Sequence, residues 1–114
     1  MDKNFYITTP IYYPSAKPHM GHAYSSIIAD FFARFKKMDD FNVCFLTGTD
    51  EHGLKIQRAA EKQNIDTLEF CDQISQTFRD LSKTLNLTNT DFIRTTEERH
   101  KKTVQYLWKE LEKN

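Results

Sequence analysis

Two histidines, His19 and His22, are the residues whose types and spacing best suit chemistry in this sequence. They lie three positions apart in the segment Pro18-His19-Met20-Gly21-His22, between an apolar run and a long helical pattern. A strand that turns at a glycine into a helix gathers backbone N–H groups and the positive end of the helix dipole, where an anion can bind. An imidazole donates a hydrogen bond to a phosphate oxygen whether it is neutral or protonated. The spacing predicts a site for a reacting phosphate, and a helix start with incidental histidines is the structural alternative.

A second polar cluster, residues 47–53 (TGTDEHG), follows a second apolar run. In open parallel sheets, ligands bind beyond the carboxyl ends of the strands. Because both clusters follow predicted strands, we expect them to converge at one edge of one sheet. Asp50 can hold an ammonium group through a charge-assisted hydrogen bond. Capping of the next helix is its structural alternative, and the two roles are compatible.

A metal site is a further interpretation, since His19, His22, His52 and Asp50 are all residue types that bind zinc. The histidine pair lies at a turn rather than in the HExxH pattern of a helix, so we favour the phosphate and predict no metal ligands. Neither a GxGxxG nor a GxxxxGK[ST] motif is present, and the chain has only three glycines. These observations argue against a dinucleotide fingerprint or a P-loop.

The first elements predict a right-handed βαβ unit. Residues 5–9 are typical of a strand, and residues 10–18 form a loop with three prolines. A helix is predicted to begin near His19 or Gly21, and residues 42–47 form a nearly continuous apolar strand suited to a parallel sheet. The loop residues 10–14 (PIYYP) mix apolar surface with phenols, which suits a ligand with an apolar tail or ordinary packing. The helical spacing predicts one buried face, made of Ile27, Ile28, Phe31, Phe32, Phe35 and Met38.

Three more helices are predicted after the second strand. The first covers about residues 54–63, and the second is capped by Asp66 or Thr67. A short extended piece at residues 92–93 precedes the last helix, where Thr95 and Glu98 resemble a capping box. The expected apolar stripe of the second of these helices is Leu68, Cys71, Ile74, Phe78, Leu81 and Leu85, and that of the last is Val104, Leu107, Trp108 and Leu111.

Composition bounds the function without identifying it. The 114 residues fit one α/β domain, and 16 basic residues balance 16 acidic ones, so no broad nucleic-acid footprint is expected. We expect no DNA or membrane partner, a cytoplasmic location, and reduced buried thiols at Cys44 and Cys71. Two clear strands with at least four helices are few for a doubly wound sheet, so we interpret the chain as an N-terminal piece of a longer protein.

Four segments resemble the N-terminal part of the methionyl-tRNA synthetase family, one of the class I aminoacyl-tRNA synthetases. They are residues 5–14 (FYITTPIYYP), 18–24 (PHMGHAY), 45–53 (FLTGTDEHG) and 91–100 (DFIRTTEERH). Met20 departs from the leucine that is commoner in this family, and HMGH also occurs in leucyl-tRNA synthetases. Those enzymes lack the GTDEHG turn, so the resemblance favours methionine.

The resemblance implies a reaction in two steps: methionine and ATP form methionyl-adenylate, and the methionyl group then passes to tRNA(Met). It implies that residues 1–114 are the N-terminal part of the catalytic nucleotide-binding domain, the first half of a Rossmann-like fold. Mg²⁺ would accompany ATP, and any zinc ligands would lie outside these residues. The implied roles are catalysis by His19 and His22, ATP binding by His19, Gly21 and His22, and methionine binding by Pro10, Ile11, Tyr13 and Asp50.

The KMSKS loop of the family, whose lysines bind the phosphates, has no counterpart in these residues. We therefore expect the 114 residues alone to be inactive. Two alternatives remain open at this point. One is another class I synthetase, for leucine, valine, isoleucine or cysteine. The other is a non-catalytic module that binds only a nucleotide or a partner.

Overall fold

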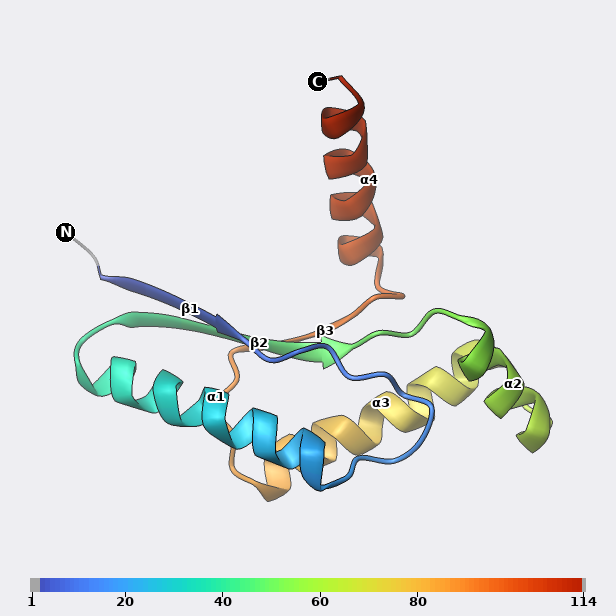
Figure 1. The fold of residues 1–114 in the computed structure, drawn as a ribbon, viewed down its shortest axis with the longest axis horizontal. Helices are drawn as coiled ribbons and strands as arrows, with labels where there is room; N and C mark the ends of the chain where they lie inside the picture. The colour runs from blue at the N-terminus through green and yellow to red at the C-terminus, as the bar shows by residue number, and fades with distance from the viewer. Residues whose placement is uncertain (1–2, 114) are drawn as a thin grey trace.

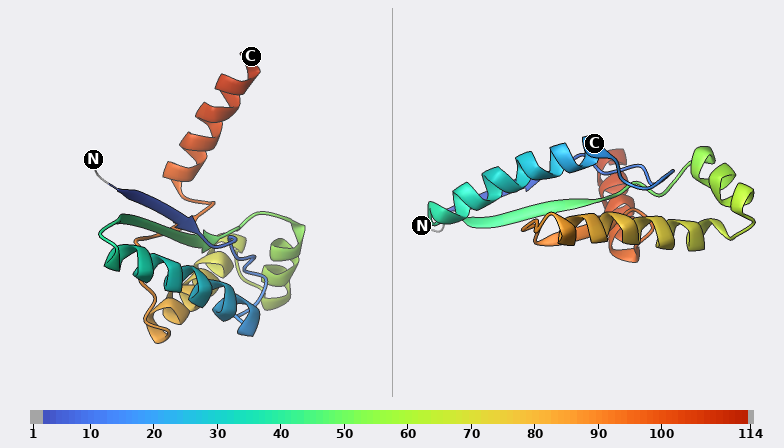
Figure 2. Two further views of the ribbon diagram at one scale, coloured as in Figure 1. Left: turned by 60° about the vertical axis from the view of Figure 1, so that its left-hand side comes forward. Right: turned by 90° about the horizontal axis from the view of Figure 1, so that it is seen from below.

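The computed structural model describes residues 3–113, which form a three-stranded parallel sheet with helices on both faces. The α/β class and the parallel arrangement predicted from the sequence are confirmed. Figure 2 shows α1 on one face of the sheet and α3 on the other. The strands, in the spatial order β1-β2-β3, are β1 (Asn4–Thr8), β2 (Asn42–Thr49) and β3 (Asp91–Arg94). The helices are α1 (Met20–Met38), α2 (Leu54–Gln63), α3 (Thr67–Thr84) and α4 (Glu98–Glu112).

The central strand, β2, carries the core and reaches the candidate site. Its residue Phe45 has no exposed surface and packs against Ala29 and Ala33 of α1. The strand ends at Thr49, two residues beyond the prediction, because both sides of its end find partners. Tyr12 forms a parallel bridge with Thr49, and the N–H of Thr95 donates to the Thr49 carbonyl at 3.2 Å.

The predicted buried face of α1 is wrong. The buried residues of this helix are Ser26, Ala29, Asp30 and Ala33. Two alanines and a serine allow the helix to lie close to the sheet. Asp30 is tolerated there because its carboxylate accepts hydrogen bonds from the N–H and hydroxyl of Thr88, at 2.7 and 2.6 Å, and from Arg34. The large apolar side chains predicted to be buried are instead 42–85% exposed: Ile27, Ile28, Phe31, Phe32, Phe35 and Met38.

The helix α3 follows its predicted pattern more closely. Asp66 caps it, accepting hydrogen bonds from the N–H groups of Leu68 and Glu69, and Cys71 and Phe78 are buried. Leu68 is exposed, contrary to the prediction, and Phe70 is buried in its place. Phe70 belongs to a cluster with α2 that the stripe along α3 could not reveal.

The helix α4 leads away from the sheet and buries none of its residues (Figure 1). Its predicted apolar stripe, at Val104, Leu107, Trp108 and Leu111, is therefore exposed. The predicted capping box is also wrong, since Glu97 occupies the N-cap position. The Thr95 hydroxyl accepts a hydrogen bond from the N–H of Glu51 instead, so this threonine serves the site rather than the helix.

Both cysteines are free thiols. Cys71 is buried as predicted, whereas the prediction for Cys44 is wrong, because this side chain is exposed on β2. Among the helices of residues 3–113, none is both long and apolar enough to cross a membrane.

Candidate functional site

The two histidines form the first turn of α1 by capping each other. His19 is the N-cap residue, and its Nδ1 accepts a hydrogen bond from the N–H of Gly21 at 3.0 Å. The Nδ1 of His22 accepts one from the N–H of His19 at 3.1 Å. This is the reciprocal arrangement of a capping box, built here from two imidazoles. The two rings stack with their centroids 3.9 Å apart.

The capping bonds fix the tautomer of both rings. A neutral imidazole whose Nδ1 accepts a hydrogen bond carries its proton on Nε2. Within the described part of the chain, neither Nε2 of this pair has a partner, so His19 and His22 each offer one N–H donor. Partial burial, and then the proximity of His19, lower the pKa of His22, which favours its neutral form. The pair therefore presents two oriented donors at a helix N-terminus, which is an arrangement suited to an anion.

Tyr12 joins the histidines to the second polar cluster. Its hydroxyl donates to the His22 carbonyl at 3.3 Å and makes a short hydrogen bond with the Ser26 hydroxyl. Its ring lies edge-on to the His22 ring, with centroids 4.9 Å apart, and stacks on Phe78. Its N–H donates to the Gly48 carbonyl at 2.9 Å, and its carbonyl accepts from the N–H of Asp50 at 2.8 Å. The structure thus brings the two clusters together at the carboxyl ends of β1 and β2.

Of the loop residues expected to bind a ligand, two are exposed and one is partly in the core. Pro10 and Ile11 are exposed beyond the end of β1. Tyr13 is half-buried and packs against the cluster that contains Ile56. Its hydroxyl lies 2.7 Å from where a Cβ would stand on Gly53, whose φ is +120°, so a side chain there is excluded by both space and backbone. Tyr12, which the sequence did not single out, holds this loop in place.

Asp50 and Glu51 are neighbours with opposite environments. The Asp50 side chain is half-buried, and its carboxylate has no hydrogen-bond or ion-pair partner among residues 3–113. The Glu51 side chain is fully buried and accepts hydrogen bonds from Arg94 and two threonines. A carboxylate and two imidazole donors that are linked through Tyr12 can together bind a zwitterion that carries or attacks a phosphate. The role of Glu51 could not be predicted from the sequence, because a single acidic residue in a polar turn is expected to be exposed.

The metal interpretation finds no support in this arrangement. In the described residues, no three His, Cys, Asp or Glu side chains are gathered as a metal site would require. The Nε2 of His52 lies 3.3 Å from the Thr95 carbonyl and is turned toward the loop after β3.

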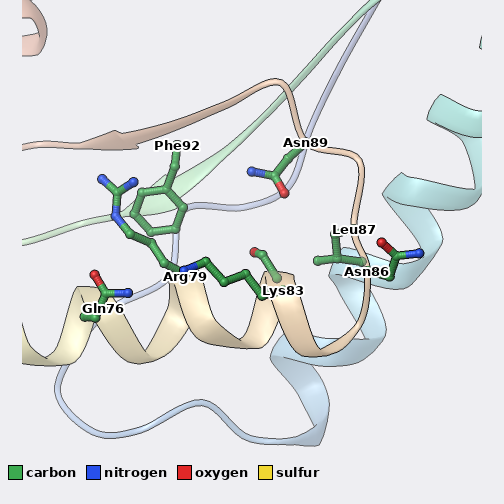
Figure 3. A pocket seen from close by; sticks show the side chains of 8 residues that line it. Gln76, Arg79, Lys83, Asn86, Leu87, Asn89 and Phe92 are labelled. Carbon is green, nitrogen blue, oxygen red and sulfur yellow. The ribbon is translucent and has the colours of Figure 1, made fainter.

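A separate cavity of about 550 Å³ lies between the C-terminal half of α3 and the loop that leads into β3 (Figure 3). There the Arg79 guanidinium covers the Phe92 ring at 4.4 Å. This cavity is at the amino end of β3, whereas the polar clusters follow the carboxyl ends of the strands. It is therefore distinct from the candidate site.

Methionine–tRNA ligases from several organisms align with nearly the whole of this chain. It is 56% identical over 110 residues to the mitochondrial methionine–tRNA ligase of Takifugu rubripes, covering 96% of this chain and 19% of that protein. It is 54% identical over 111 residues to the methionine–tRNA ligase of Rickettsia bellii, covering 97% of this chain and 22% of that protein. The chain thus spans about a fifth of the length of these relatives.

The chain also superimposes on solved structures of aminoacyl-tRNA synthetases. The chain superimposes on the Mycobacterium tuberculosis methionyl-tRNA synthetase in complex with methionyl-adenylate with a TM-score of 0.92 and 45% identity, over 94% of this chain and 21% of that one. A LeuRS of Agrobacterium radiobacter, in a ternary complex with tRNA and LeuAMS, shares the fold at a TM-score of 0.82 and 21% identity, over 98% of this chain and 15% of that one.

The family profile described as "tRNA synthetases class I (M)" matches residues 5–114. That match covers the strands and helices described above, apart from Asn4 at the start of β1, together with both polar clusters. The first half of a Rossmann-like fold, the HMGH and GTDEHG segments and the named relatives lead to one assignment: the chain belongs to the methionyl-tRNA synthetase family of the class I tRNA synthetases.

Proposed function

We propose that the protein containing this chain is a methionine–tRNA ligase, and that residues 1–114 form the N-terminal part of its catalytic nucleotide-binding domain. The observation that carries the proposal is the pair of fixed Nε2 donors of His19 and His22, joined through Tyr12 to the unpaired carboxylate of Asp50. The methionyl-adenylate in the related M. tuberculosis structure supports the same chemistry. The cytoplasmic location expected from the sequence is also part of the proposal.

In the proposed first step, a carboxylate oxygen of methionine attacks the α-phosphorus of ATP. The bond from that phosphorus to the bridging oxygen breaks, and pyrophosphate leaves with the electron pair. His19 and His22 donate from Nε2 to the phosphate oxygens as charge moves toward the leaving group. Because both donors are held before substrate binds, they act by electrostatic preorganisation and not as nucleophiles. In the second step a hydroxyl at the 3′ end of tRNA(Met) attacks the methionyl carbonyl carbon, the bond from that carbon to the phosphate oxygen breaks, and AMP leaves as the methionyl ester forms.

In this proposal the remaining site residues take the roles that the family resemblance implies. Gly21 is assigned to ATP binding, and its lack of a side chain also leaves the His19 ring in its capping position, since a Cβ there would stand 2.9 Å from Cε1 and 3.1 Å from Nδ1 of His19. Asp50 binds the methionine ammonium, and Pro10, Ile11 and Tyr13 line the space for its side chain. Any Mg²⁺ would be bound by the phosphates of ATP, and no described residue is assigned to it. Zinc, where the full protein holds it, has its ligands outside this chain.

The test is methionine-dependent exchange between ATP and pyrophosphate in the full-length protein carrying Asp50→Asn. We expect the KM for methionine to rise by about tenfold to a hundredfold, the worth of a hydrogen bond to a charged group. The matched control is Asp80→Asn, an exposed carboxylate on α3. Exchange that depends on leucine in preference to methionine, or nucleotide binding without any exchange, would contradict the proposal.

A further inference from the structure

Glu51 is held at the end of β2 by an unusual number of donors. Its side chain has no exposed surface. Arg94 donates to both carboxylate oxygens, with Nε at 2.7 and 3.0 Å and a terminal nitrogen at 2.7 Å. The hydroxyls of Thr49 and Thr96 add hydrogen bonds of 2.5 and 3.0 Å. An ionised carboxylate is stable in such a place only when it is paired and hydrogen-bonded, so this network is what keeps Glu51 inside.

The same arginine connects three elements. Arg94 is the last residue of β3, and its side chain is 18% exposed. Besides binding Glu51 beyond the end of β2, it forms an ion pair of 2.6 Å with Asp72 of α3. The hydrogen bonds that Arg94 donates to Glu51, and then the one that it donates to Asp72, raise the pKa of Arg94, which stays charged. The end of β2 is thereby fixed to both β3 and α3.

Asp50 has no such anchor of its own. Among residues 3–113 its carboxylate has no partner, and its backbone N–H donates a hydrogen bond to the Tyr12 carbonyl. On the other side, the N–H of Glu51 donates to the Thr95 hydroxyl at 2.8 Å. The direction of the Asp50 carboxylate therefore depends on the backbone of this turn. Glu51, the next residue in the turn, is held in place by Arg94.

We propose that the Glu51–Arg94 ion pair is a positioning device that aims the Asp50 carboxylate at the ammonium group of an amino-acid substrate. This inference rests on the proposed function, and neither member of the pair touches the substrate. Removal of Arg94 leaves a buried charge without compensation, and the turn at residues 50–52 must rearrange to hydrate it. The histidine pair, which is held by its own reciprocal hydrogen bonds, keeps its geometry.

The experiment measures steady-state ATP–pyrophosphate exchange in the full-length protein with Arg94→Met. We expect the KM for methionine to rise by about tenfold or more, because a misaimed charged hydrogen bond weakens substrate and transition state alike. We expect kcat and the KM for ATP to change by less than about threefold. Arg94→Lys, which keeps the charge but loses the two-pronged contact, should give an intermediate KM.

Two further measurements separate positioning from general damage. The first is the inhibition constant of 4-(methylsulfanyl)butanoate, which is methionine without its amino group and should bind wild type and Arg94→Met equally well. The second is the double variant Asp50→Asn/Arg94→Met, whose KM for methionine should equal that of Asp50→Asn alone, since Arg94 acts through Asp50. The matched control is Arg99→Met, an arginine in the same region that pairs with Asp91 and Glu97 instead of Glu51.

Equal losses for methionine and its deaminated analogue would overturn the inference, as would additive effects in the double variant or an unchanged KM in Arg94→Met. These results differ from a failure of the proposed function, in which the wild-type protein would show no methionine-dependent exchange. If Arg94→Met does not fold, Arg94→Lys decides through the same analogue comparison, since only a positioning role gives a loss specific to methionine.

Discussion

The two functions of the His22 ring can be separated by two substitutions. Its Nδ1 accepts the capping hydrogen bond from His19, and its Nε2 is the proposed phosphate donor. In His22→Asn the amide oxygen stands near the position of Nδ1 and nothing replaces Nε2. In His22→Gln the amide nitrogen reaches the position of Nε2 and nothing replaces Nδ1. The pair of variants therefore tests which nitrogen serves the reaction.

The expected magnitudes follow from the contacts. Loss of one preorganised donor should lower the exchange rate of His22→Asn by about 10²–10³-fold. His22→Gln should stay within about tenfold of wild type, because the donor is kept. Both variants lose the edge contacts of the ring with Tyr12 and Phe78, worth about 1 kcal/mol each. Only His22→Gln also loses the cap, so its free energy of unfolding should lie about 1 kcal/mol below that of His22→Asn.

The assay is methionine-dependent ATP–pyrophosphate exchange in the full-length protein, with urea unfolding as the measure of stability. The reasoning predicts opposite orders for the two variants: Gln above Asn in activity, and Asn above Gln in stability. If both orders agree, so that the less stable variant is also the less active one, activity follows structural integrity and the assignment of Nε2 to the phosphate is refuted.

Three other predictions concern strand packing, thiol chemistry and pH. In Gly48→Ala, the new Cβ would stand 2.0 Å from the Ile93 carbonyl oxygen, so β2 and β3 must separate. We expect urea unfolding to show a free energy of unfolding lower by about 3 kcal/mol, and a decrease below about 1 kcal/mol would contradict this. Burial, followed by the nearby Glu51 carboxylate, raises the pKa of the Cys71 thiol to about 11, so iodoacetamide at neutral pH should modify Cys44 alone, as read by peptide mass mapping. Folding lowers the pKa of His22 from its usual 6.5, so the unfolded chain binds the proton more readily. The free energy of unfolding should therefore fall as the pH drops below 6.5, and His22→Asn should remove that part of its dependence on pH.

The sequence predicted the fold class and most element bounds because these depend on local patterns. The helix at 54–63 was predicted as it is found, and Asp66, which caps the next helix, was one of the two caps predicted for it. The inward face of α1 could not be read this way, since the favourable burial of Asp30 depends on Thr88, which lies 58 residues away in the chain. A large apolar stripe predicts burial only where a neighbouring element covers it, and no described element covers the phenylalanines of α1.

The candidate site was also predicted only in part. The two clusters stand out by residue type, and the rule for parallel strands was enough to predict that they meet. The residues that hold the two clusters together have no distinctive pattern in the sequence. Tyr12 is one phenol among several in its loop, and Glu51 and Arg94 are ordinary charged residues until β3 is placed beside β2.

The amides of Asp50 and Glu51 are adjacent in the chain but bonded to different parts of the molecule. One is bonded to the Tyr12 carbonyl in the loop after β1, and the other to the Thr95 hydroxyl, 44 residues further along. In hydrogen–deuterium exchange they should report two separate openings. The label would enter at Asp50 when the loop at residues 10–14 lifts, and at Glu51 when the segment at residues 94–96 detaches. A ligand that closes the loop alone would slow exchange at the first amide and leave the second unchanged.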